Sequence, residues 1–135
     1  MANRWAVSAI ALSVLSLPFL FPHVVEDFAR DVAERGDLPS GIAGMLLGIL
    51  LAVQMVGIAL ASRGRLVGIV LIALSGAVWI AGAIAHHGRP LLAEGLGFRR
   101  SVLSACWVIG LMVGQAGAVV LAIGALIARR NPGRA

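Results

Sequence analysis

Residues 41–85 have the sequence GIAGMLLGILLAVQMVGIALASRGRLVGIVLIALSGAVWIAGAIA, and this stretch decides the fold. Its two apolar runs, 41–61 and 66–85, are separated only by SRGR at 62–65. A helix rises about 1.5 Å per residue, so roughly 20 apolar residues cross the roughly 30 Å hydrocarbon core of a bilayer. The stretch therefore predicts two membrane-spanning helices joined by a tight turn.

Two further apolar runs, 5–21 and 102–128, flank this hairpin, and none of the four runs contains a formal charge. Pro18 has no backbone N–H and is expected to kink the first run. Of the whole chain, 60% is hydrophobic and 13% charged, against about 45–50% and about 25% in soluble domains. The prediction is a single all-α domain over 1–135, an integral membrane four-helix bundle.

The segment between the first two runs is long and charged. In VVEDFARDVAER (24–35), Val25, Phe28 and Val32 recur at helical spacing on one face, while acids and arginines occupy the other. This pattern predicts an additional short amphipathic helix in the first outer loop, which lies at the membrane surface, covers a cavity between the spans or docks a partner.

The charges indicate how the chain sits in its membrane. All 11 basic residues are arginine, and most lie near the ends of apolar runs, where guanidinium groups meet headgroups and water. The net charge of +5 is therefore expected to contact the lipid bilayer and no nucleic acid. Six arginines against five favour cytoplasmic termini. We predict an integral protein of the bacterial plasma (inner) membrane.

Small residues at four-residue intervals let helix backbones approach closely in lipid. Three predicted spans carry such rows, which suggests that these three form the tight core, with the rows packing inside the chain or against a second copy. The rows are Gly44, Gly48 and Ala52; Ala73, Ala77 and Ala81; and Gly110, Gly114 and Ala118.

Few polar side chains lie within the spans. Gln54 and Gln115 are each near the middle of a run, and Ser75 and Trp79 are further candidates. A carboxamide in hydrocarbon strongly prefers a partner. The two glutamines are expected either to bond neighbouring helices or to face each other along a polar path.

No catalytic motif is present, and no carboxylate, histidine or lysine falls within the predicted spans, so we expect neither an enzyme nor proton-coupled transport. No cofactor is expected. The alternative is a metal ion or haem held at the outer side, where the chain has several potential ligands. These are His23, His86 and His87 with Glu26, Asp27 and Glu94.

Three functions remain open. The first is a non-catalytic accessory subunit of a membrane complex or a self-associating homo-oligomer, which the small-residue rows and the amphipathic helix favour. The second is a small-solute transporter or channel with a polar path near Gln54 and Gln115. The third is a haem-binding or metal-binding membrane protein that uses the outer histidines.

Overall fold

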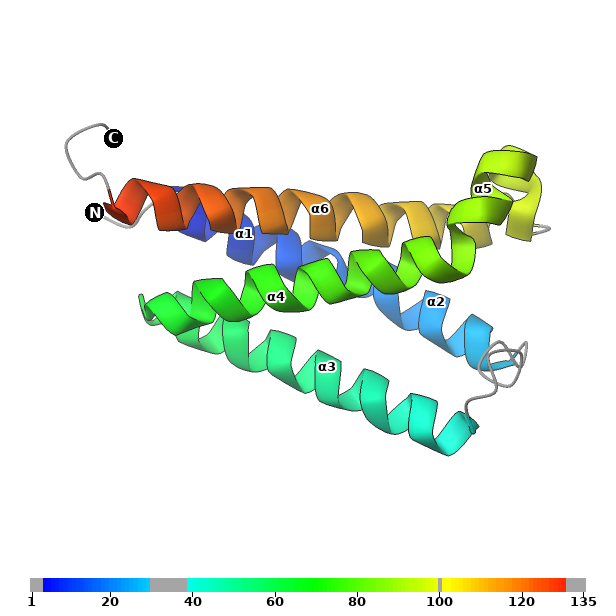
Figure 1. Cartoon of the computed structure of the whole chain (residues 1–135), viewed down its shortest axis with the longest axis horizontal. Coiled ribbons are helices and arrows are strands. Elements are labelled where there is room, and N and C mark those ends of the chain that lie inside the picture. Colours follow the sequence, from blue (N-terminus) through cyan, green and yellow to red (C-terminus); the bar gives the residue numbers. More distant parts are fainter. Residues whose placement is uncertain (1–3, 30–38, 100, 131–135) are drawn as a thin grey trace.

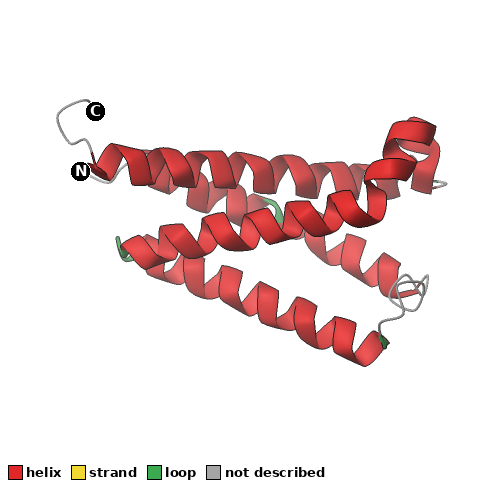
Figure 2. Cartoon of the chain, viewed as in Figure 1, coloured by secondary structure: helices red, strands yellow, loops and turns green. Residues whose placement is uncertain are grey.

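A computed structural model describes residues 4–29, 39–99 and 101–130 of the chain, and the regular structure in these ranges is entirely helical (Figures 1 and 2). The helices are α1 (Arg4–Leu15), α2 (Leu17–Ala29), α3 (Ser40–Ser62), α4 (Leu66–Ala83), the π-helix η2 (Ile84–Gly88), α5 (Arg89–Glu94), the 3-10 helix η3 (Gly95–Arg99) and α6 (Val102–Arg130).

Within the described ranges, four helical stretches are long and apolar enough to cross a membrane, as the sequence predicts. They are Arg4–Ala29, Ser40–Ser62, Leu66–Phe98 and Val102–Arg130. The first and third extend well beyond the predicted ends at 21 and 85. The first now includes His23, Glu26 and Asp27, and the third includes His86, His87, Arg89 and Glu94, so ionisable groups expected outside the spans belong to these longer helices.

The separate amphipathic helix predicted at 24–35 is not confirmed. Residues 24–29 form the last turns of α2, which begins at Leu17 and continues through Pro22. Residues 30–35 lie outside the described residues. The described part of this segment therefore continues the first span.

The first span is broken near Pro18, which confirms the predicted kink. Ser16 separates α1 from α2, and its carbonyl accepts the backbone N–H groups of Phe19 at 3.1 Å and Leu20 at 3.0 Å. Pro18 has no N–H to offer the Val14 carbonyl one turn earlier, so the regular ladder cannot continue. The break gives α2 a direction of its own.

The packing order differs from the expected one. In Figure 1, α6 lies along α1 and α4 and also contacts α2, whereas α3 packs along α4 and touches α1. Two pairings of the expected core are present, α3 with α4 and α4 with α6, but α6 packs along the first span instead of along α3.

The α3–α4 turn has a well-defined cap. The N–H of Gly64 bonds the Ala61 carbonyl and the N–H of Arg65 bonds the Leu60 carbonyl, both at 2.9 Å, which is the Schellman arrangement. Gly64 has φ +73°, a conformation that glycine adopts without steric cost. The first turn of α1 and the last turn of α6 lie at this same end of the bundle, which we call the arginine end (Figure 1). It carries Arg4, Arg63, Arg65, Arg129 and Arg130.

The predicted small-residue rows have different surroundings. The α6 row packs inside the chain: Gly110 lies against Phe19, Gly114 lies against Ser16, and Ala118 is fully buried. By contrast, several members of the α3 and α4 rows are exposed. These are Gly48, Ala52, Ala77 and Ala81, while Gly44 and Ala73 are half-buried.

Gly68 permits the closest approach of α3 and α4. A Cβ atom at this position would stand 2.1 Å from the backbone nitrogen of Ala61. We expect Gly68→Ala to lower the free energy of unfolding by about 2 kcal/mol or more, because backbone cannot yield as a flexible side chain can.

Reversible unfolding in mixed micelles would measure this change. Gly48→Ala is the matched control, since an added Cβ there meets no atom within 4 Å. It should leave stability unchanged or slightly raised. Equal stabilities of the two variants would contradict the packing described.

Candidate functional site

Gln54 joins three helices at the break in the first span. Its Nε2 donates to the Ser13 hydroxyl at 3.0 Å and to the Ser13 carbonyl at 3.2 Å, and its Oε1 accepts the Trp79 indole N–H at 2.7 Å. Gln54 is 0% exposed. The side chain thus ties α1 to both α3 and α4.

Gln115 makes the corresponding link from α6. Its Nε2 donates to the Ser16 hydroxyl at 2.8 Å, and that hydroxyl donates in turn to the Ser13 carbonyl at 2.8 Å. Its Oε1 faces Gly76 of α4 and accepts no hydrogen bond from the part of the chain that the structure describes. We call Ser13, Ser16, Gln54, Trp79 and Gln115 the kink network.

The arrangement bears on the predicted polar path. Gln54 and Gln115 are both 0% exposed and bond different serines at the kink instead of each other. Ser75 is buried and bonds the Ile72 carbonyl of its own helix at 3.3 Å, apart from the network. Gln54 and Gln115 therefore bond neighbouring helices, which is the first of the two alternatives that the sequence leaves open for the glutamines.

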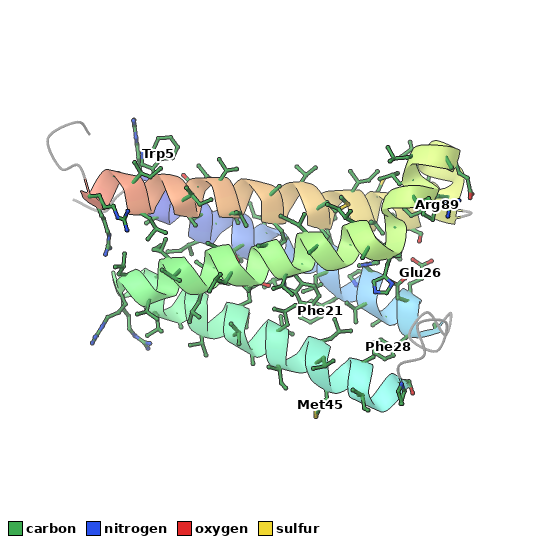
Figure 3. The ribbon with its side chains drawn as sticks, in the orientation of Figure 1. Trp5, Phe21, Glu26, Phe28, Met45 and Arg89 are labelled. Atoms are coloured by element: carbon green, nitrogen blue, oxygen red, sulfur yellow. The ribbon has the colours of Figure 1, made fainter. Side chains whose placement is uncertain are left out.

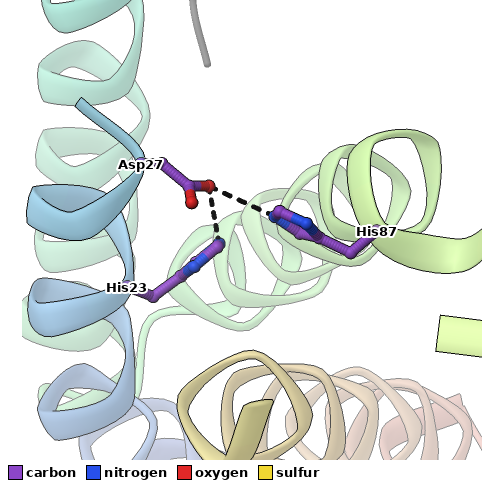
Figure 4. A group of neighbouring side chains, drawn as sticks. All are labelled: His23, Asp27 and His87. Carbon is purple, nitrogen blue, oxygen red and sulfur yellow. Dashed lines mark hydrogen bonds and ion pairs between the residues drawn. The ribbon is translucent and has the colours of Figure 1, made fainter. Parts of the chain in front are cut away.

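A second polar group lies at the opposite end of the bundle from the arginine end, and we call this the histidine end. Asp27 Oδ2 of α2 is 3.5 Å from His23 Nε2 and 3.2 Å from His87 Nε2 of η2 (Figure 4). His23 is 7% exposed and His87 is 5% exposed. We call these three residues the His–Asp–His cluster.

Helical spacing explains how His23 and Asp27 come together. They are four residues apart, so they lie on the same face of α2, one turn from each other. The break at Ser16 aims this face toward the end of the third span. The bundle thus adds His87, which is 60 residues distant in the sequence from Asp27.

The π-helix decides which of the two adjacent histidines points inward. In a continuous α-helix, at about 100° per residue, His86 would lie within about 20° of Trp79 and His87 about 80° away. A π turn contains an extra residue and shifts the register of the residues after it. His87 is accordingly buried in the cluster, and His86 is exposed.

Neighbouring contacts fix the histidine end. Ser104 Oγ of α6 bonds Glu26 Oε2 of α2, and the Phe98 ring lies 6.0 Å from the His87 ring between centroids. Phe28 packs against Gly44 of α3. A Cβ atom added to Gly44 would lie 3.7 Å from Cζ of Phe28. Figure 3 shows Glu26 and Phe28 on α2 near this end.

A cavity of about 660 Å³ opens beside the His–Asp–His cluster. The three cluster residues and His86 form its polar part, and apolar side chains of α2, α3 and α4 with Leu111 of α6 form the rest. Trp79 belongs to this wall and to the kink network. The cavity thus has polar groups on one part of its wall and apolar side chains over the rest.

The cluster has the donors of a transition-metal site. One ligand atom from each residue lies within 4.8 Å of the other two. Two nitrogen or oxygen ligands held tetrahedrally at about 2.0–2.2 Å from a zinc ion are about 3.3–3.6 Å apart, close to the two separations from Asp27. Two imidazoles and one carboxylate are a common donor set for zinc and ferrous iron.

Of the six ligands expected from the sequence, the structure brings together His23, Asp27 and His87. His86 lines the cavity but is not part of the cluster, Glu26 bonds Ser104, and Glu94 is exposed at the end of α5. Comparison with protein-family models, with curated protein sequences and with solved structures gave no match.

The kink network predicts a measurable role for Gln54 in stability. Replacing Gln54 by Leu removes bonds to α1 and leaves the buried Trp79 N–H without its acceptor. We expect a loss of about 2 kcal/mol in the free energy of unfolding, since an orphaned buried donor costs about 1–3 kcal/mol.

The control is Met55→Leu, which changes the next residue of α3, an exposed one. It should shift stability by less than about 0.5 kcal/mol. If Gln54→Leu unfolds in mixed micelles at the same point as this control, the network does not stabilise the bundle.

Proposed function

We propose that this small membrane protein binds a divalent transition-metal ion at the histidine end of its bundle. The observation that carries the proposal is the meeting of His23, Asp27 and His87, two from α2 and one from η2, with one donor atom of each within 4.8 Å of the other two. The proposal concerns binding; the absence of enzymatic activity stays a prediction.

Burial supports a built site. Charged or polar groups removed from water need partners, and metal coordination is one way to supply them. His23 and His87 are both buried, and Asp27 has 18% of its side chain exposed. Three protein ligands also leave a fourth tetrahedral position for another molecule.

The geometry favours an ion over the haem considered from the sequence. A haem held by two histidines needs an imidazole on each face of a wide planar ring. Here Asp27 Oδ2 lies within 3.5 Å of both Nε2 atoms, so a carboxylate occupies the space between the rings. His86, the third histidine considered as a haem ligand, is exposed and lies outside the cluster.

The other two functions have less support. Gln54 and Gln115 are fully buried and bond Ser13 and Ser16, and these bonds do not support a polar path for a solute. Self-association or an accessory role stays a prediction. The α6 row is taken up inside the chain, so a second copy would use the exposed small residues of α3 and α4, such as Gly48 and Ala77.

Titration of the purified full chain with Co²⁺ tests the proposal, because cobalt reports its ligands through visible absorption. We expect one ion per chain and a spectrum typical of tetrahedral nitrogen and oxygen ligation. His87→Ala should weaken binding at least about tenfold, since removal of one ligand loses a coordinate bond.

His86→Ala provides the matched control, because this adjacent histidine is exposed and outside the cluster. Its cobalt affinity should equal that of the unmodified chain. The three residues also form a hydrogen-bonded cluster without an ion. Absence of cobalt binding, or equal losses in His86→Ala and His87→Ala, would leave that purely structural role and overturn the proposal.

A further inference from the structure

We infer that the cavity beside the cluster takes the hydrocarbon tail of a long-chain carboxylate, whose headgroup occupies the open position of the bound ion. This inference rests on the proposed function, since it names the ligand class of the same site. It concerns coordination alone, in which a carboxylate oxygen takes the place of a water molecule.

The layout of the cavity supports an amphiphile. His23, Asp27 and His87 line one part of its wall, and the remainder is almost entirely apolar, including Leu47 and Leu50 of α3. Its volume of about 660 Å³ lies within the usual range of ligand sites, about 300–1,000 Å³. A ligand bound there meets polar groups on one part of the wall only.

Charge selects the headgroup. A divalent cation with two neutral imidazoles and the Asp27 carboxylate carries a net charge of +1. An uncompensated charge is costly where apolar walls exclude water. A carboxylate as fourth ligand brings the site to neutrality, whereas an ester or an alcohol does not.

The cavity also has an entrance suited to a lipid-soluble molecule. Leu46 of α3 and Val78 and Gly82 of α4 line it and are exposed on the outside of the bundle. These helices converge at the arginine end and separate toward the histidine end (Figure 1). A tail can therefore enter sideways between α3 and α4, from the surface that faces hydrocarbon.

The test adds oleate, methyl oleate or acetate to the cobalt-loaded full chain and follows the visible spectrum of the ion. Oleate should change the spectrum at one equivalent per chain. Methyl oleate has the tail without the charge, and acetate has the charge without the tail. Both should need at least about tenfold higher concentration, because each lacks one of the two interactions.

A variant that fills the cavity separates the tail from the metal. Gly82 lines the cavity, and a Cβ added there meets no atom within 4 Å. Gly82→Phe should keep cobalt affinity and weaken the oleate response at least about tenfold, because its ring takes up the space of the tail. Gly48→Phe, at an exposed glycine outside the cavity lining, should respond normally.

The outcomes distinguish the two proposals. A chain that binds no cobalt overturns the proposed function and this inference with it. A chain that binds cobalt but responds alike to oleate, methyl oleate and acetate, or whose oleate response survives Gly82→Phe, overturns the inference alone. If Gly82→Phe fails to bind cobalt, Leu46→Trp on the opposite wall replaces it, with the same expectations.

Discussion

The bond between Gln54 and Ser13 is the constraint on which the rest of the bundle depends. A bilayer offers no water to a polar group, so a buried carboxamide needs partners within the protein. Gln54 bonds Ser13 beside the break in the first span, and Trp79 completes its pairing. This fixes α1 against α3 and α4. The course of α2 beyond the break then decides where His23 and Asp27 lie.

The two ends of the bundle differ for a related reason. At the arginine end, the Schellman turn around Gly64 and the close approach at Gly68 bring α3 and α4 together. The helices separate from there, and the cavity occupies the wider end. Tight packing in one half thus creates room in the other, where α2 and η2 supply polar side chains that a fully packed bundle would not accommodate.

Composition and periodicity were sufficient for the four long apolar helices and for the kink at Pro18, because lipid requires continuous apolar runs and proline removes a donor. They did not predict where the first and third spans end. Charges after Pro22 suggested a new surface helix, whereas α2 continues to Ala29. The pairing of Asp27 with His87 spans 60 residues, and a π turn sets its register. Neither the long-range pairing nor the π turn can be predicted from a pattern of residues at α-helical spacing.

Trp79 has two roles at once. Its indole N–H bonds Gln54 at 2.7 Å, and its side chain lines the cavity. The π turn gives Trp79 and His87 a shared face, and both side chains line the cavity. A ring displaced by an occupant would pull on the Gln54 carboxamide, and through it on Ser13. Contacts therefore run from the cavity wall through Trp79 and Gln54 to Ser13, beside the bend of the first helix.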